Sequence, residues 1–249
     1  MTKNMPAKKN YHHGDLAQTL ISAAIDLIAL KGVSALSLRE VARVADVSHA
    51  APAHHFGDKS GLLTAIAIKG LRELTEALES SGAAKPATDS GRLIASGEAY
   101  IRFLLDHPAY FAVMFRPDLV IEDDSDYQTA SQQPGAVLTQ FIEESLEASG
   151  KKLHPDIVSA TAIALWSQVH GFASLWSTSN LGDLEDQDLL SETMTRMFNA
   201  IQLPWLLPDC SDFAAGRDNP NAIPMALTIK ETTMPATNAT EGTLSNNTT

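Results

Sequence analysis

The chain has 249 residues, enough for one large domain or two small ones. It contains no run of about 18 apolar residues, the length that a membrane-spanning helix needs. A single cysteine, Cys210, excludes a disulfide framework within the chain, and the basic N-terminus lacks the apolar core of a signal peptide, so we expect a cytoplasmic protein. The net charge of -12 is uneven, because residues 1–72 carry nine Lys and Arg against five Asp and Glu. A mildly basic head on an acidic body is typical of a modular protein in which only the head meets phosphate.

The first predicted helix covers residues 16–30, where apolar side chains recur at helical spacing. Asp15 is placed to cap its start, and Gly32 is placed to end it. A second helix is predicted to begin at Ser37, because Ser37 and Glu40 have the spacing of a capping box. In that motif each side chain accepts a hydrogen bond from the other residue's backbone amide.

This second helix is predicted to end at Asp46, a residue type that tolerates the left-handed conformation of a turn. Ser48 is then expected to cap a short third helix through about His55, and Asp58 to cap a fourth helix over residues 59–80. Two short helices joined by a tight turn are the arrangement of a helix-turn-helix, whose second helix enters the major groove of DNA.

The rest of the chain is also predicted to be helical, and no alternating β pattern of useful length is present, so the expected fold class is all-α. Small residues and a proline predict a linker at 80–91. The acidic stretch 116–133 is interpreted as a solvated loop or a partly ordered insertion, and the tail from Pro208 as disordered. The further predicted helices are about 90–106, 108–116, 134–149, 155–178 and 186–202.

Residues 11–66 carry several specific elements: a helix that ends in Lys-Gly, then LSLREVA, a Val-Ser turn and the string HF-x-DK-x-x-LL. This stretch resembles the N-terminal domain of TetR/AcrR-family transcription regulators. Asp106-His107-Pro108 and Trp166-x-x-x-His170-Gly171 are similar to one branch of that family. The resemblance implies an N-terminal three-helix helix-turn-helix domain joined to a C-terminal helical domain that binds a ligand and dimerises.

The domain organisation follows from this resemblance and the predicted helices. We expect a flexible basic arm at 1–14, a DNA-binding domain at 15–80, a regulatory and dimerisation domain at 90–207 and a disordered tail at 208–249. The arm either reaches DNA or is a frayed, charged terminus.

The resemblance also implies a DNA-binding surface on the second and third predicted helices. Lys59, at the N-terminus of the fourth helix, would hold a phosphate where the helix dipole also favours an anion. Two residues depart from the family pattern, since Ala53 stands where many members have an aromatic ring and Asp46 replaces the usual glycine of the turn. The residues assigned to the surface are Ser37, Arg39, Ser48, His49, Ala50, Ala53, His54, His55 and Lys59.

The function implied is that of a repressor that acts as a homodimer on a pseudo-palindromic operator of double-stranded DNA and responds to a small-molecule effector. Pairing of the subunits is expected through the last two long helices. The alternative is a protein-interaction module that keeps the fold without specific operator binding, which Ala53 and the net acidity favour. No catalytic constellation is recognisable, so we expect neither an enzyme nor a cofactor.

Five histidines in the first 55 residues raise the question of a metal site. His49 and His54 cannot form a neat cluster, because a five-residue helical offset separates side chains by about 140°. His12 and His13 with Asp15 form a denser group, but no partner at metal spacing can be named. We therefore expect no metal, and DNA contact or plain surface roles for these histidines.

Aromatic side chains recur in the second half of the chain, with Trp166 and His170 one turn apart on the same helix face. They either line a ligand pocket, form a subunit contact or pack in the core with a satisfied histidine. Gly171 inside this helix suggests close approach by another helix or room for a ligand. The pocket candidates are Phe103, Tyr110, Phe111, Phe115, Trp166 and His170, with Tyr100 as a further ring in the same region.

Overall fold

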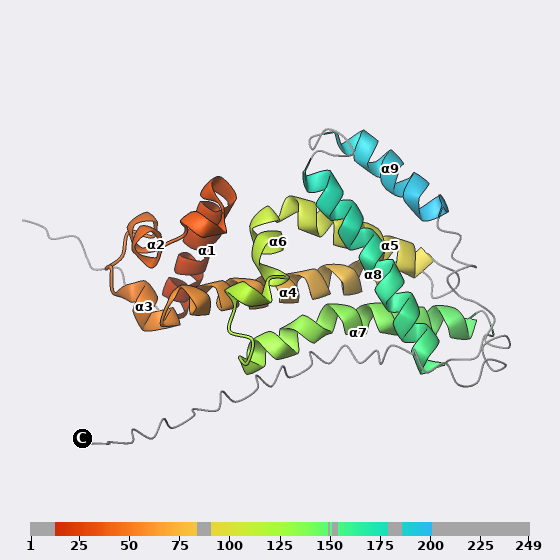
Figure 1. Ribbon diagram of the computed structural model, residues 1–249, viewed down its shortest axis with the longest axis horizontal. Coiled ribbons are helices and arrows are strands. Elements are labelled where there is room, and N and C mark those ends of the chain that lie inside the picture. Colours follow the sequence, from red (N-terminus) through yellow and green to blue (C-terminus); the bar gives the residue numbers. More distant parts are fainter. Residues whose placement is uncertain (1–12, 84–90, 149, 151–153, 179–185, 201–249) are drawn as a thin grey trace, which may run out of the picture. The chain divides into compact units, whose positions relative to one another are not determined.

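The computed structural model describes residues 13–83, 91–148, 150, 154–178 and 186–200, and all regular elements in these ranges are helical (Figure 1). This confirms the all-α fold class. No helix within these ranges is long and apolar enough to cross a membrane. The elements in chain order are α1 (His13–Lys31), the 3-10 turn η1 (Val33–Ala35), α2 (Leu38–Val44), α3 (Ala51–Phe56), α4 (Lys59–Ala83), α5 (Gly91–Asp106), α6 (Pro108–Met114), the 3-10 turn η2 (Pro117–Leu119), α7 (Ser125–Ala148), α8 (Pro155–Ser177) and α9 (Gln187–Ala200).

Most of the expected N-terminal arm and the whole expected tail lie outside the described residues. The described part of the arm corrects one boundary, because α1 begins at His13 and Asp15 lies inside its first turn instead of capping it. The other end was predicted correctly: Gly32 has a φ of 78° and donates its N–H to the Ile28 carbonyl at 2.8 Å.

The prediction of a loop over 116–133 was wrong for much of its length, because η2 and the first part of α7 lie there. Asp124 caps α7, since its Oδ1 accepts hydrogen bonds from the backbone amides of Asp126 and Tyr127, both at 2.9 Å. Tyr127 and Ala130 are buried on the inner face of this added length. The acidic residues misled the prediction, because Asp124 caps the helix and Asp126 lies in its first turn, where negative charge is favoured.

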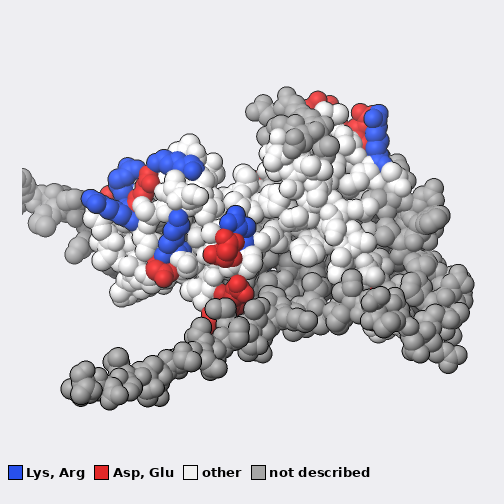
Figure 2. Space-filling view, in the orientation of Figure 1, with Lys and Arg blue, Asp and Glu red and all other residues white. Residues whose placement is uncertain are grey.

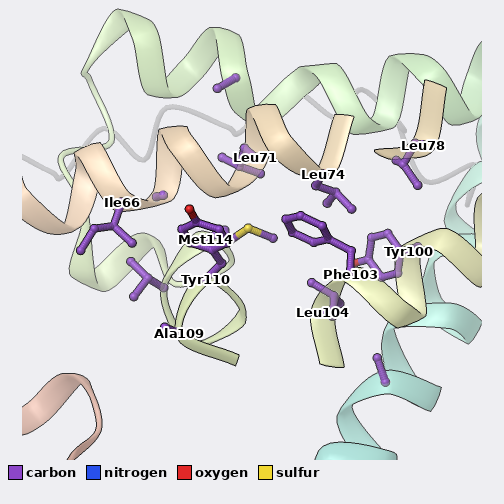
Figure 3. Packing of buried hydrophobic residues seen from close by; sticks show 14 of the residues in the cluster. Ile66, Leu71, Leu74, Leu78, Tyr100, Phe103, Leu104, Ala109, Tyr110 and Met114 are labelled. Atoms are coloured by element: carbon purple, nitrogen blue, oxygen red, sulfur yellow. The ribbon is translucent and has the colours of Figure 1, made fainter. Parts of the chain in front are cut away.

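α4 holds the fold together, because it packs against α5, α6 and α7 along its length and against α1 and α3 near its start (Figure 1). Its buried leucines, among them Leu71 and Leu74, point toward Tyr110 and Met114 of α6 and toward rings of α5 (Figure 3). Gly70 permits the short distance between α4 and α6, because a Cβ there would lie 2.8 Å from both Tyr110 Cγ and Met114 Sδ. α6 in turn contacts α1 and η1, so it lies between the first helix and the body.

Candidate nucleic-acid interface and aromatic cluster

The turn between α2 and α3 is a Schellman motif centred on Asp46. Asp46 has a φ of 53°, in the left-handed region, as its residue type predicted. The amide of Val47 donates to the Ala42 carbonyl at 3.0 Å, and the amide of Asp46 donates to the Arg43 carbonyl at 3.4 Å. Ala42 is fully buried and Val47 is half-buried, so the turn is fixed both by backbone hydrogen bonds and by packing.

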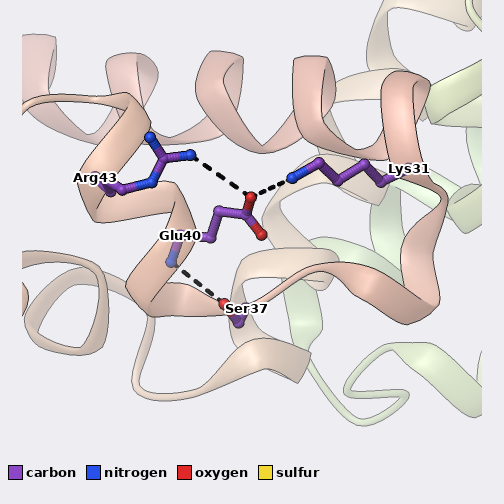
Figure 4. Close-up of polar contacts among 4 residues, drawn as sticks. All are labelled: Lys31, Ser37, Glu40 and Arg43. Atoms are coloured by element: carbon purple, nitrogen blue, oxygen red, sulfur yellow. Dashed lines mark hydrogen bonds and ion pairs between the residues drawn. The ribbon is translucent and has the colours of Figure 1, made fainter.

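Only half of the expected capping box at the start of α2 forms. Ser37 Oγ accepts a hydrogen bond from the Glu40 amide at 3.3 Å, but the Glu40 carboxylate turns away to Lys31 at 2.5 Å and Arg43 at 3.7 Å (Figure 4). The physical reason is that a charged donor outcompetes a neutral backbone amide. The hydrogen bond from Lys31 keeps the pKa of Glu40 below its usual value. The end of α1 is thereby joined to α2.

The prediction that Ser48 caps α3 was also wrong, because the helix begins at Ala51 with Ala50 as its N-cap. The Ser48 carbonyl accepts a hydrogen bond from the Ala51 amide at 3.0 Å, so that amide is not available to the serine side chain. Pro52 lies in the first turn, where a backbone N–H would have no acceptor within the helix, so the missing N–H of proline costs nothing there. Its side chain is buried. It fixes the inner face of this six-residue helix.

The passage from α3 to α4 depends on a close backbone approach at Gly61. Asp58 Oδ1 accepts from the Gly61 amide at 3.0 Å, which confirms Asp58 as the cap of α4. A Cβ on Gly61 would lie only 2.0 Å from the carbonyl oxygen of Phe56. A glycine is therefore required where the first turn of α4 meets the end of α3. This role was not predicted from the sequence, where the available signal was a glycine inside a predicted helix.

The residues expected to meet DNA occupy a common outer surface on α2, α3 and the turn between them. Pro52 and Phe56 take the inner face of α3, so Ala53 and His54 face outward. Lys and Arg side chains gather on the surface formed by α1–α3 (Figure 2). Of the predicted set, His55 and Lys59 are half-buried, and the exposed members are Ser37, Arg39, Ser48, His49, Ala50, Ala53 and His54.

Lys59 makes hydrogen bonds within the protein that its sequence position did not suggest. Its Nζ donates to the carbonyl oxygens of Val33 at 2.9 Å and Ser34 at 3.4 Å, both at η1. These bonds tie the start of α4 to the connection between α1 and α2. They use two of the three N–H donors of the ammonium group, and no described residue accepts the third.

A cluster of five rings, called the aromatic cluster below, brings together α5, α6 and α8. Its members are Tyr100 of α5, Phe111 of α6, Phe115 at the end of α6, and Trp166 and His170 of α8. The Tyr100 hydroxyl lies 2.9 Å from His170 Nδ1 and accepts a hydrogen bond from Trp166 Nε1 at 2.9 Å. Burial raises the pKa of Tyr100 and lowers the pKa of His170.

The structure divides the six pocket candidates into two groups. Four of them meet in the aromatic cluster, where Phe111 and Phe115 pack edge-on around His170 with centroid distances of 5.4 and 4.9 Å. Phe103 and Tyr110 instead stack on each other, with their ring centroids 6.2 Å apart, and are buried among the leucines of α4 (Figure 3). Phe103 and Tyr110 therefore pack in the core, as one of the alternatives from the sequence expected.

Two family models match the chain over its two halves. One, described as bacterial regulatory proteins of the tetR family, matches residues 20–66, and the other, described as a tetracyclin repressor-like C-terminal domain, matches residues 93–198. Together they cover more than half of the chain. A comparison with curated proteins gives no match.

Solved structures share the fold over most of this chain. A protein of unknown function from Rhodococcus sp. RHA1 is 29% identical, with a TM-score of 0.64 over 78% of this chain and 98% of that chain. A tetR-family regulatory protein from Rhodococcus RHA1 is 22% identical, with a TM-score of 0.58 over 75% and 96%. FadR from Bacillus subtilis, in complex with stearoyl-CoA, is 15% identical, with a TM-score of 0.60 over 74% and 97%. The chain therefore belongs to the TetR family and is a DNA-binding, helix-turn-helix transcription regulator.

Proposed function

We propose that this regulator is a ligand-responsive repressor that acts in the cytoplasm as a homodimer on a pseudo-palindromic operator. In this proposal residues 15–80 form the DNA-binding domain, and residues 90–207 form the regulatory and dimerisation domain. The observation that carries it is the outer surface of α3, which stays exposed while Pro52 and Phe56 fix the inner face against the core. A short helix held in this way beside an exposed α2 start is suited to the major groove.

The homodimer is supported by a face of α8 that no described residue covers. Trp166 and Leu175 are 38% and 48% exposed and lie at the two edges of this face. Small side chains lie between them, and a Cβ on Gly171 would meet no atom within 4 Å. A self-complementary contact about a two-fold axis would cover such a face and would give the dimer two copies of α3. Successive major grooves then set their separation at about 34–36 Å.

The response to a ligand is supported by the position of the aromatic cluster. It joins α5, α6 and α8, and α6 also contacts α1 and η1 beside the helix-turn-helix. The neighbour FadR is described in complex with stearoyl-CoA, which supports a small-molecule effector for a protein of this fold without identifying it. An effector releases DNA only if it binds the DNA-incompetent arrangement more tightly than the DNA-binding one.

Operator binding is tested by fluorescence anisotropy with DNA from upstream of the protein's own gene, over a series of salt concentrations. We expect specific binding that weakens steeply as salt rises, because phosphate contacts release counterions. Specific binding to no genomic fragment would overturn the repressor and favour the protein-interaction module.

Arg39→Ala provides the residue-level test, because Arg39 is exposed and makes no ion pair with any described residue. Loss of one phosphate contact should weaken binding to every DNA sequence and reduce the slope of log K against log salt by about 0.9. The matched control is Arg72→Ala, which removes an exposed arginine of α4 that lies outside the assigned surface and outside α8 and α9, and which should leave DNA binding unchanged. Equal effects of the two substitutions would argue against the assigned surface.

A further inference from the structure

The hydrogen bonds of the aromatic cluster have only one consistent direction. The indole N–H of Trp166 is a donor only, so the Tyr100 oxygen must be the acceptor of that bond. Tyr100 is 4% exposed, and its hydroxyl has no partner among the described residues other than Trp166 and His170. Its hydrogen therefore goes to His170 Nδ1, because a buried O–H without an acceptor is costly.

This direction determines the state of the imidazole. If Nδ1 accepts a hydrogen bond, it carries no proton, and His170 is the neutral tautomer protonated at Nε2. Burial lowers the pKa of His170, which favours the same neutral state. Burial also raises the pKa of Tyr100, so the hydroxyl keeps its hydrogen. The cluster thus presents His170 Nε2–H as a fixed hydrogen-bond donor.

Nothing in the described part of the chain uses that donor. His170 Nε2 has no hydrogen-bond partner among the described residues. It is also not one of the fully buried polar atoms that lack a partner, so a ligand could approach it. Three partly exposed rings stand around the imidazole: Phe111 and Phe115 at 88° and 89° to it, and Trp166 at 69°. One oriented donor among apolar rings is the composition typical of a small-molecule site.

The charges around the cluster limit what it can bind. Its members come from α5, α6 and α8, and only Tyr100 and His170 among them can titrate. Neither residue makes an ion pair with a described residue. An anion would lose its hydration there without a countercharge. The ring faces attract a cation, but the His170 Nε2–H bond presents its positive end to the same space and opposes that attraction.

We propose that the aromatic cluster is the effector subsite for an uncharged, flat, apolar molecule with a hydrogen-bond acceptor, which His170 Nε2–H recognises. The identification of this molecule as the effector rests on the proposed function. Tyr100 and Trp166 are positioning residues in this proposal, because they fix the tautomer that donates.

The test measures binding of four small aromatic probes to the purified full chain by NMR titration, without DNA. Acetophenone has the acceptor, and cumene has nearly the same shape without it. Benzoate and phenyltrimethylammonium carry the two charges. We expect acetophenone to bind about fivefold more tightly than cumene, in the range of one net hydrogen bond, and both to bind more tightly than the ions. Equal affinities, preference for either ion, or no binding because a second copy covers the cluster would each overturn the proposal.

His170→Phe keeps a ring and removes the donor, so acetophenone should fall to the affinity of cumene while cumene stays unchanged. Tyr100→Phe should leave His170 in place but mix its two tautomers, which ¹H–¹⁵N spectra of the imidazole detect directly. Tyr127→Phe is the matched control, because it removes another buried hydroxyl, which contacts the Met114 carbonyl, and should change neither readout. Unchanged discrimination in His170→Phe, or a single tautomer in Tyr100→Phe, would contradict the assigned roles.

The outcome separates this proposal from the proposed function. Discrimination between acetophenone and cumene that His170→Phe abolishes, in a protein that binds no operator, would keep the subsite and remove the repressor. Operator binding by a protein that shows no such discrimination would do the reverse. Release of the operator by acetophenone but not by cumene would support both.

Discussion

Gly61 shows how a single backbone position can decide whether α3 is held in place. In most helices a change from glycine to alanine is favourable by about 1 kcal/mol. At Gly61 the added Cβ would meet a backbone carbonyl oxygen, that of Phe56, at 2.0 Å, and this atom cannot rotate away. We expect Gly61→Ala to lower the free energy of unfolding by about 1 to 3 kcal/mol, the usual cost of overpacking. Urea unfolding followed by circular dichroism measures it.

Gly135→Ala is the matched control for that substitution. Gly135 also lies inside a long helix, α7, but a Cβ there would meet no atom within 4 Å. This variant should gain up to about 1 kcal/mol from helix propensity alone. A stabilised Gly61→Ala variant would mean that the end of α3 can move away from α4 at little cost.

At the scale of the element, α7 is a helix that continues through a proline. Pro134 has no N–H for the carbonyl four residues earlier, that of Ala130, and Ala130 is fully buried. We expect Pro134→Ala to restore this donor and to raise the free energy of unfolding by about 1 to 3 kcal/mol. Urea unfolding at fixed protein concentration measures the change.

Pro155→Ala is the comparison variant for α7, because Pro155 is the first residue of α8, where no helical hydrogen bond is lost. Its unfolding free energy should stay within about 0.5 kcal/mol of the parent chain. If the two proline variants behaved alike, the interior position of Pro134 would carry no penalty, and another donor would have to satisfy the Ala130 carbonyl.

The elements that could be predicted from the sequence are those with a local cause. Asp58 and Asp46 act through hydrogen bonds or backbone angles within a few residues, so their roles follow from residue type and spacing. The start of α7 was missed although its cap is local, because the acidic residues around it were interpreted as a solvated loop.

The interactions that the sequence could not predict join residues that are far apart along the chain. Lys59 meets Val33 across 26 positions, and Tyr100 meets His170 across 70. The half-formed capping box has the same origin, because Lys31 reaches Glu40 only once α1 and α2 have packed together. Such partners depend on the tertiary arrangement, which no periodicity in the sequence encodes.

At the scale of the whole molecule, His170 connects stability to pH. Its pKa is lowered by burial in the folded chain, while the unfolded chain has the ordinary value of about 6.5. The unfolded state therefore binds the proton first as pH falls. The stabilisation is fully present above about pH 6.5 and is lost as pH falls through the folded-state pKa.

We expect the unfolding free energy of the parent chain to decrease relative to that of His170→Phe between pH 7.5 and pH 5, because the variant lacks this titration. Subtracting the two curves removes the contribution of the other titrating groups. A difference that does not change with pH would mean that His170 has the same pKa in both states.

Dimer formation is the last property at this scale, and the exposed face of α8 allows a direct test. Leu175, 48% exposed, lies on the edge of that face, so an arginine there would bring one charge from each subunit into the expected contact. We expect Leu175→Arg to sediment as a monomer at concentrations at which the parent chain is a dimer, and to lose affinity for a two-half-site operator. Leu30→Arg is the control, because Leu30 on α1 is even more exposed, at 77%, but lies outside α8 and α9. It should remain a dimer, and a monomeric parent chain or a dimeric Leu175→Arg variant would place the subunit contact elsewhere.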